Sequence, residues 1–192
     1  MGNETASYAV VLERIGKKVL QALQDLPERA LDWVPPLPVC HSLLDCATEL
    51  ITAGEFWINT VIAGQNTQSI ERDELLVVLY TYGEHSYLIA RYERWLHTLH
   101  EILDELSDTC MDMVIILPPY HRAFVNKGPA TVRDCLLHLI ECSAYKQGKI
   151  LLLCQFYKEA EQLSTQNIDQ PEESTSYQTS EAKTYSTMQA DD

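Results

Sequence analysis

The chain has 192 residues, of which 46% are hydrophobic, and it carries a formal net charge of −14. This length fits one domain, or one domain with a tail, and the apolar share suffices for a sizeable core. Such an acidic surface repels phosphate groups, which argues against nucleic acid and anionic membranes as partners.

The beginning of the chain has no basic stretch followed by an apolar run, so we expect no signal peptide. The apolar runs are far shorter than the ~20 residues that span a bilayer. Six cysteines are spread along the chain, which fits reduced thiols better than a disulfide framework. We therefore expect a cytoplasmic protein. The cysteines are Cys40, Cys46, Cys110, Cys135, Cys142 and Cys154.

Helical periodicity dominates the sequence, and it shows no strand-like alternation of any length. The first predicted helix covers about residues 7–26 and ends before Pro27. The second begins at Ser42, an N-cap residue with Asp45 three positions later as in a capping box, and ends near Gly64. The apolar stripe of the first helix consists of Val10, Val11, Ile15, Val19, Leu20 and Leu23.

The third predicted helix covers about residues 69–106, with Gly83 as a point where it can bend, and the fourth runs from Thr131 to about Leu163. A long crossover, residues 107–130, would let these two helices run in the same direction. Its apolar stretch, residues 113–117, would cover one end of the bundle. The third helix's apolar stripe consists of Leu75, Leu79, Tyr82, Leu96, Leu99, Leu103 and Leu106.

Four amphipathic helices predict an all-α fold, a four-helix bundle with a long crossover between helices 3 and 4, formed by residues 1–163. Residues 164–192 contain six carboxylates against one lysine and are rich in Ser, Thr and Gln. Such a segment buries too little apolar surface to offset its ordering entropy, so we predict a disordered acidic tail.

One face of the fourth helix contains a lysine among apolar residues. A lysine on such a face must extend to solvent, lose its proton or meet an anion. Glu49, on or next to the buried face of the second helix, is the predicted anion. The face consists of Cys135, Leu139, Cys142, Lys146, Ile150 and Leu153, at helical spacing.

Residues 131–150 resemble the last-helix motif of the DinB-like (DinB/YfiT) superfamily. In that motif, two metal-binding histidines four residues apart precede a glycine and an aliphatic residue, which Gly148 and Ile150 match. Residues 42–57 are similar to the family's second helix, and Trp33-Val34-Pro35 resembles the Trp-x-Pro that precedes it. The resemblance covers about residues 8–157 and implies the DinB-like four-helix bundle.

The family's three histidines hold a divalent metal, typically zinc or nickel, on which its thiol-dependent transferase or isomerase activities depend. The resemblance places Glu49, Cys142 and Lys146 at those positions. A protonated lysine has no lone pair with which to bind a metal. We therefore expect no metal or other cofactor here, and a Glu49–Lys146 ion pair across the bundle in its place.

This reading predicts a non-catalytic module that binds an unknown small molecule or protein. Three alternatives stay open. Lys146 could extend to solvent without a partner, or it could lower the pKa of Cys142 and activate its thiol for transferase-like chemistry. A relocated divalent metal site could also form from Cys135, His138 and Cys142 with Cys46 opposite.

The third helix concentrates aromatic residues, which favours either core packing or a dimer surface. We therefore expect a homodimer. These residues are Tyr80, Tyr82, Tyr87, Tyr92 and Trp95.

Overall fold

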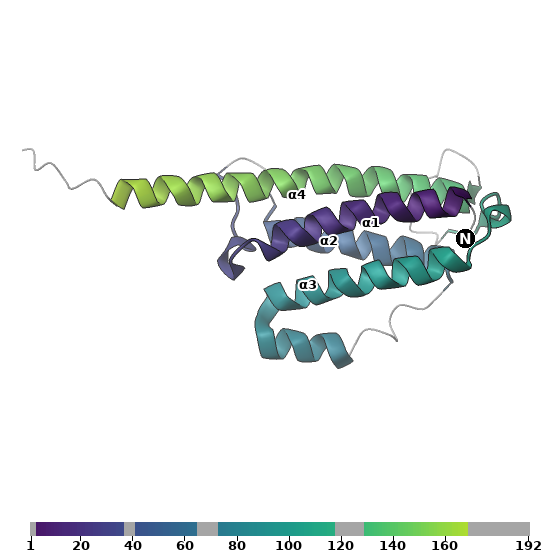
Figure 1. Ribbon diagram of the computed structural model, residues 1–192, viewed down its shortest axis with the longest axis horizontal. Coiled ribbons are helices and arrows are strands. Elements are labelled where there is room, and N and C mark those ends of the chain that lie inside the picture. Colours follow the sequence, from purple (N-terminus) through teal and green to yellow (C-terminus); the bar gives the residue numbers. More distant parts are fainter. Residues whose placement is uncertain (1–2, 37–40, 65–72, 118–128, 169–192) are drawn as a thin grey trace, which may run out of the picture.

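The computed structural model describes residues 3–36, 41–64, 73–117 and 129–168, and Figure 1 shows their helices gathered into one bundle. The predicted all-α four-helix bundle is confirmed. Its long helices are α1 (Asn3–Gln24), α2 (Leu43–Glu55), α3 (Asp73–Glu105) and α4 (Val132–Ile168). None of the described helices is long and apolar enough to cross a membrane.

The predicted starts of the second and fourth helices agree with the observed caps, whereas α1 begins four residues before its predicted start and α3 four residues after it. The Ser42 side chain accepts a hydrogen bond from the Asp45 backbone N–H, and the Asp45 carboxylate accepts one from the Ser42 N–H, which completes a capping box. Thr131 and Asp134 form the same reciprocal pattern before α4. These caps fix where α2 and α4 begin, and therefore which side chains face each other across the bundle.

The direction of the helices differs from our expectation for α3 and α4. Thr5, at the start of α1, donates to Asp108 just beyond α3, while Glu4 pairs with Arg133 at the start of α4. Helix α1 is therefore antiparallel to α3 and parallel to α4. The crossover thus connects two antiparallel helices, and α2 is parallel to α3.

Helix α3 is interrupted at Gly83, where φ is 85° and ψ is 177°. Figure 1 shows the segment before this residue folded back beside the bundle, so the predicted bend is a full break. Tyr82 consequently stays exposed, contrary to its predicted place on the apolar stripe. A Cβ at position 83 would collide with the Glu28 carboxylate, and the positive φ also favours glycine.

The crossover contains a small two-stranded ribbon that the helical periodicity did not predict. Strand β1 (Val114–Ile115) pairs antiparallel with β2 (Ala130–Thr131). Within the predicted apolar cover, Ile115 and Leu117 pack against the core, whereas Ile116 is 95% exposed. The prediction that this stretch covers one end of the bundle therefore holds for only part of it.

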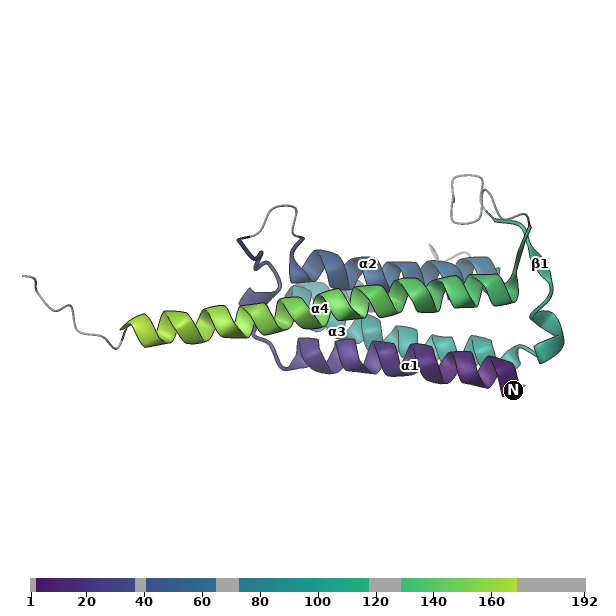
Figure 2. The same ribbon diagram turned by 90° about the horizontal axis from the view of Figure 1, so that it is seen from above.

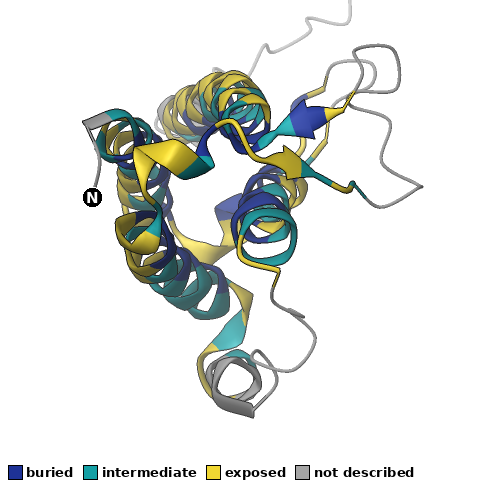
Figure 3. Ribbon diagram, turned by 90° about the vertical axis from the view of Figure 1, so that its right-hand side faces the viewer, coloured by how far each residue is buried: buried dark blue, intermediate teal, exposed yellow. Residues whose placement is uncertain are grey.

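The core of the described residues consists of two clusters, and buried residues line the inner faces of the helices in Figure 3. Trp95 lies in a tight contact between α1 and α2. A Cβ at Gly54 would come within 2.6 Å of the indole, and one at Gly16 within 2.9 Å. The two glycines therefore make room for this side chain, which is 1% exposed. On the predicted stripe of the first helix, Ile15, Val19 and Leu23 are buried, whereas Val10 is exposed.

Helix α4 continues to Ile168, five residues past the predicted end at Leu163. Most of the predicted tail, residues 169–192, lies outside the described residues, as do Cys40 and the side chains of Leu75 and Tyr80.

Candidate functional site

Helices α2 and α4 lie side by side and antiparallel (Figure 2). The Trp57 and His138 rings are in edge contact, with centroids 5.2 Å apart. Glu49 lies eight residues before Trp57, and Lys146 lies eight residues after His138. These two residues also contact each other. The antiparallel register is therefore the same at both contacts, and it places Ala53 on α2 opposite Cys142 on α4. This surface is the α2–α4 seam.

The structure brings together two of the three predicted pocket residues. Lys146 Nζ donates to Glu49 Oε2 over 2.7 Å, so the alternative that Lys146 has no partner is wrong. This hydrogen bond lowers the pKa of the Glu49 carboxyl below its ordinary value.

The pair is less buried than we expected. The Glu49 side chain is 53% exposed and that of Lys146 is 25% exposed. Water therefore screens the charges, and loss of one partner leaves the other still hydrated.

Cys142, the third predicted position, is one helical turn from Lys146. Its Sγ lies 3.6 Å from His138 Nε2. Burial raises the pKa of this thiol, and the neighbouring carboxylate of Glu141 raises it further, while Lys146 lowers it by less. The proposed activation by Lys146 is therefore outweighed, and the thiol form dominates at neutral pH.

The four residues of the alternative metal site do not converge. Cys135 packs in the core cluster that contains Trp57, whereas Cys46 packs in the other cluster with Ile150. Burial raises the pKa of Cys135 to about 11, which disfavours the thiolate that a metal needs. Within the described residues, no group of three or more His, Cys, Asp or Glu side chains is arranged to hold a metal ion.

The α2–α4 seam also fails to fit the metal that the family resemblance implies. Glu49 supplies a carboxylate, but its Oε2 already accepts from Lys146, which is an ammonium without a lone pair. The raised pKa keeps Cys142 protonated. The seam thus offers a cation and a thiol where a divalent metal needs anionic or neutral donors.

A largely buried ion pair that the sequence did not lead us to expect joins α2 to α3. Arg91 donates from Nε to Glu55 Oε1 over 2.9 Å, from Nη2 to Glu55 Oε2, and from Nη2 to Thr52 Oγ1 over 3.0 Å. Both ion-pair side chains are 12% exposed. Glu55 stands four residues after Ile51 and three before Ile58, both fully buried. The helical period could therefore have revealed it.

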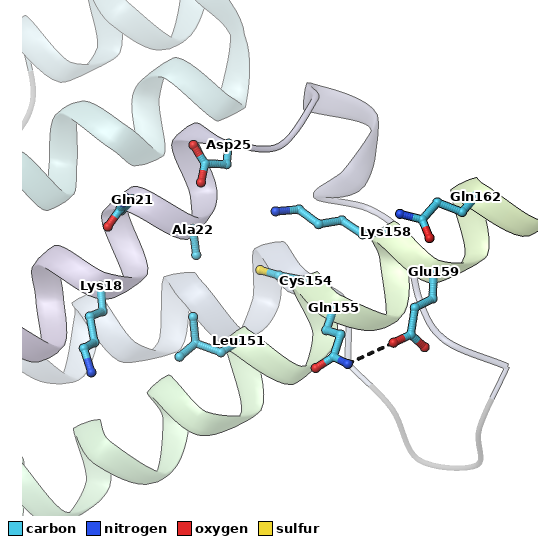
Figure 4. Close-up of a pocket in the computed structure, with 10 residues that line it drawn as sticks. All are labelled: Lys18, Gln21, Ala22, Asp25, Leu151, Cys154, Gln155, Lys158, Glu159 and Gln162. Carbon is cyan, nitrogen blue, oxygen red and sulfur yellow. Dashed lines mark hydrogen bonds between the residues drawn. The ribbon is translucent and has the colours of Figure 1, made fainter.

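A groove of about 640 Å³ lies on the other side of α4, against α1 (Figure 4). Leu151 and the buried Cys154 form its apolar part, and Lys18 and Lys158 stand at its sides. Gln155 donates to Glu159 along its α4 wall, over 2.9 Å. None of these residues was expected from the sequence to form a site.

Comparison with known proteins supports the fold. No family model matches the sequence, and no curated protein matches it. Among solved structures, the chain is similar to a DinB-like protein (YjoA) from Bacillus subtilis, with a TM-score of 0.57 and 13% sequence identity. The match covers 81% of this chain and 93% of that one. The protein is thus a four-helix bundle, and its fold is DinB-like, as the sequence resemblance implied.

Proposed function

We propose that this protein is a DinB-like binding module in which an internal ion pair replaces the metal, so that it acts without metal-dependent catalysis. The observation that carries the proposal is the 2.7 Å contact between Lys146 Nζ and Glu49 Oε2. The resemblance aligns both residues with metal ligands, and a lysine cation beside a carboxylate supplies the positive charge that the ion would bring.

The surroundings of Cys142 favour this proposal over a thiol-dependent transferase. A nucleophilic cysteine needs a lowered pKa and access to solvent. Burial and Glu141 move the pKa of Cys142 in the other direction. His138, which could act as its base, is also held in edge contact with Trp57.

The proposal is tested by rebuilding a three-histidine site. We expect the triple variant Glu49→His, Cys142→His and Lys146→His to bind about one equivalent of zinc or nickel, because three imidazoles then face one point. The unaltered protein should bind none. Metal content after dialysis, measured by elemental analysis, gives the result.

The matched control is the double variant Glu49→His and Cys142→His, which keeps Lys146. It should bind far less metal, because the ammonium still lies where the ion would sit. One equivalent of metal in the unaltered protein would overturn the proposal. Absence of binding in a folded triple variant would show that the three positions do not correspond to the family's ligands.

A further inference from the structure

We infer that residues 169–181, the acidic segment that follows α4 in the chain, fold back and occupy the groove between α1 and α4. The groove lies on another side of α4 than the α2–α4 seam (Figure 4), so its occupancy is independent of the ion pair between Glu49 and Lys146. The charge of the groove, its place beside the end of α4 and the order of its side chains all fit this segment.

The α1–α4 groove is the middle part of a longer furrow. A hollow of about 290 Å³ shares Lys18 and Gln21 with the groove, and another of about 520 Å³ shares Lys158 and Gln162 with it. The second hollow extends to Thr165, three residues before α4 ends. The furrow therefore leads to the point where the following segment of the chain begins.

The furrow is rich in basic residues on a strongly acidic chain. Five basic and four acidic residues line it, whereas the whole chain has 14 basic and 28 acidic residues. Among the described residues, Arg14, Lys18 and Lys158 take part in no ion pair. Two of the four carboxylates are already paired, which leaves Asp25 and Glu159. An anionic segment can therefore pair with cations that have no partner within the bundle.

The segment that follows α4 has the opposite charge. Residues 169–181 contain four carboxylates and no basic residue. Pro171, three residues after Ile168, has no N–H with which to continue the hydrogen bonds of the helix. Because the segment is tethered at the end of the furrow, its effective concentration there is on the order of millimolar, and weak surface ion pairs suffice to hold it.

The reach of the segment fits the spacing of the cations along the furrow. Lys158 lies ten residues before the end of α4, about 15 Å along the helix. Glu173, the fifth residue of the segment, can extend about 17 Å from that end. The ion pair that joins the starts of α1 and α4 places Lys18 about 31 Å from the same end. Glu181 can extend about 43 Å and therefore reaches Lys18 with slack.

The apolar part of the groove lies between these two cations. It contains Cys154 and the 38% exposed Leu151, between Lys158 and Lys18 in Figure 4. Tyr177 likewise lies between the acidic residues of the segment. An acid, an aromatic ring and a second acid thus follow one another in the order in which the furrow offers a cation, an apolar surface and a second cation. Contact between the ring and the apolar surface adds to the two ion pairs.

Carbodiimide crosslinking of the full chain tests the inference, because this reagent joins a carboxylate to an amine only where the two are in contact. Peptide mass analysis should find a link between Lys158 and one of residues 172–173. It should find a second link between Lys18 and Glu181. Lys149 is the matched control, since it lies on the side of α4 that faces α2, and it should form no link with the segment. In a mixture of isotope-labelled and unlabelled protein, each link should join residues of one chain.

Proteolysis gives a second measurement. The double variant Lys18→Gln and Lys158→Gln should raise the rate at which a glutamate-specific protease cleaves after Glu173 by about fivefold, because loss of two surface ion pairs frees the segment. Lys149→Gln should leave this rate unchanged, and circular dichroism shows whether each variant is folded. Equal linkage of the segment to all three lysines, links only between different chains, or an unchanged cleavage rate in the double variant would each overturn the inference.

Discussion

The Lys146 ammonium and the Glu49 carboxylate form a short contact in a setting that water still reaches. An ion pair with one partner half exposed gains little net free energy, because screening and side-chain ordering offset the attraction. The ion pair therefore contributes mainly to the relative position of the two helices. It holds α2 and α4 in step and fills the α2–α4 seam with a fixed cation, whereas the energy of the fold comes from the core beside it.

A double-mutant cycle with Glu49→Gln and Lys146→Met measures this contribution. We expect a coupling of less than about 1 kcal/mol at pH 7 in urea denaturation. The pKa of Glu49 is lower in the folded state than its ordinary value of 4.5. The coupling is therefore fully present above about pH 4.5 and disappears as the pH falls through the lowered pKa. A coupling of several kcal/mol, or one that persists at pH 2, would contradict this account.

Thiol reactivity should follow the local surroundings of each cysteine. The hydrogen bond with Ser107 lowers the pKa of Cys110, which is partly exposed, whereas burial raises the pKa of Cys142. We expect iodoacetamide at pH 7 to label Cys110 before Cys142 and before the buried cysteines of the described chain. Peptide mass analysis over time gives the order, and Ser107→Ala should slow labelling of Cys110 alone. Faster labelling of Cys142 would revive the thiol-transferase alternative.

At the scale of elements, α2 uses two acidic residues in different ways. Glu49 faces α4 near solvent, while Glu55, six residues later, faces α3 in a bidentate pair with Arg91. Just beyond Glu55 the helix widens into the π-helix η2 (Phe56–Ile62). The buried pair therefore fixes how α2 packs on its parallel neighbour immediately before the helical geometry changes.

Removing one partner of the buried pair should cost much more than removing one partner of the exposed pair. Glu55→Ala removes the carboxylate that neutralises the poorly hydrated Arg91 guanidinium, and we expect it to lower the free energy of unfolding by about 3 kcal/mol. Glu49→Ala on the same helix is the matched control and should cost less than about 1 kcal/mol. The double variant Glu55→Leu and Arg91→Met should recover part of the loss. Equal costs for the two alanine variants would contradict this distinction.

Local sequence signals predicted where two helices start and which residues face each other between them. The irregular parts of the helices depend on long-range packing. Ser42 with Asp45 and Thr131 with Asp134 marked two helix starts, because a cap involves only neighbouring residues. The spacing that placed Lys146 opposite Glu49 is likewise a property of two regular helices. The break at Gly83 and the widened turn after Glu55 depend on contacts with other elements, which periodicity does not encode.

At the scale of the whole molecule, the predicted direction of α3 and α4 was wrong because a long connection permits either arrangement. The contacts of Thr5 with Asp108 and of Glu4 with Arg133 determine the choice, and both join residues more than 100 positions apart. The α2–α4 seam was easier to anticipate than the bundle around it. Its residues lie in segments whose sequence resembles a known family, whereas the Glu55–Arg91 pair and the α1–α4 groove come only from packing.

The partners of α1 have a consequence for synthesis on the ribosome. This first helix packs against α3 and α4 rather than against α2, which follows it in sequence. At about 5–20 residues per second, the ribosome needs about 7–30 s to pass from the end of α1 to the end of α4. During that interval Leu12, Ile15 and Val19 emerge before their final neighbours exist. The nascent chain must therefore keep this apolar surface from aggregating until its last helix leaves the exit tunnel.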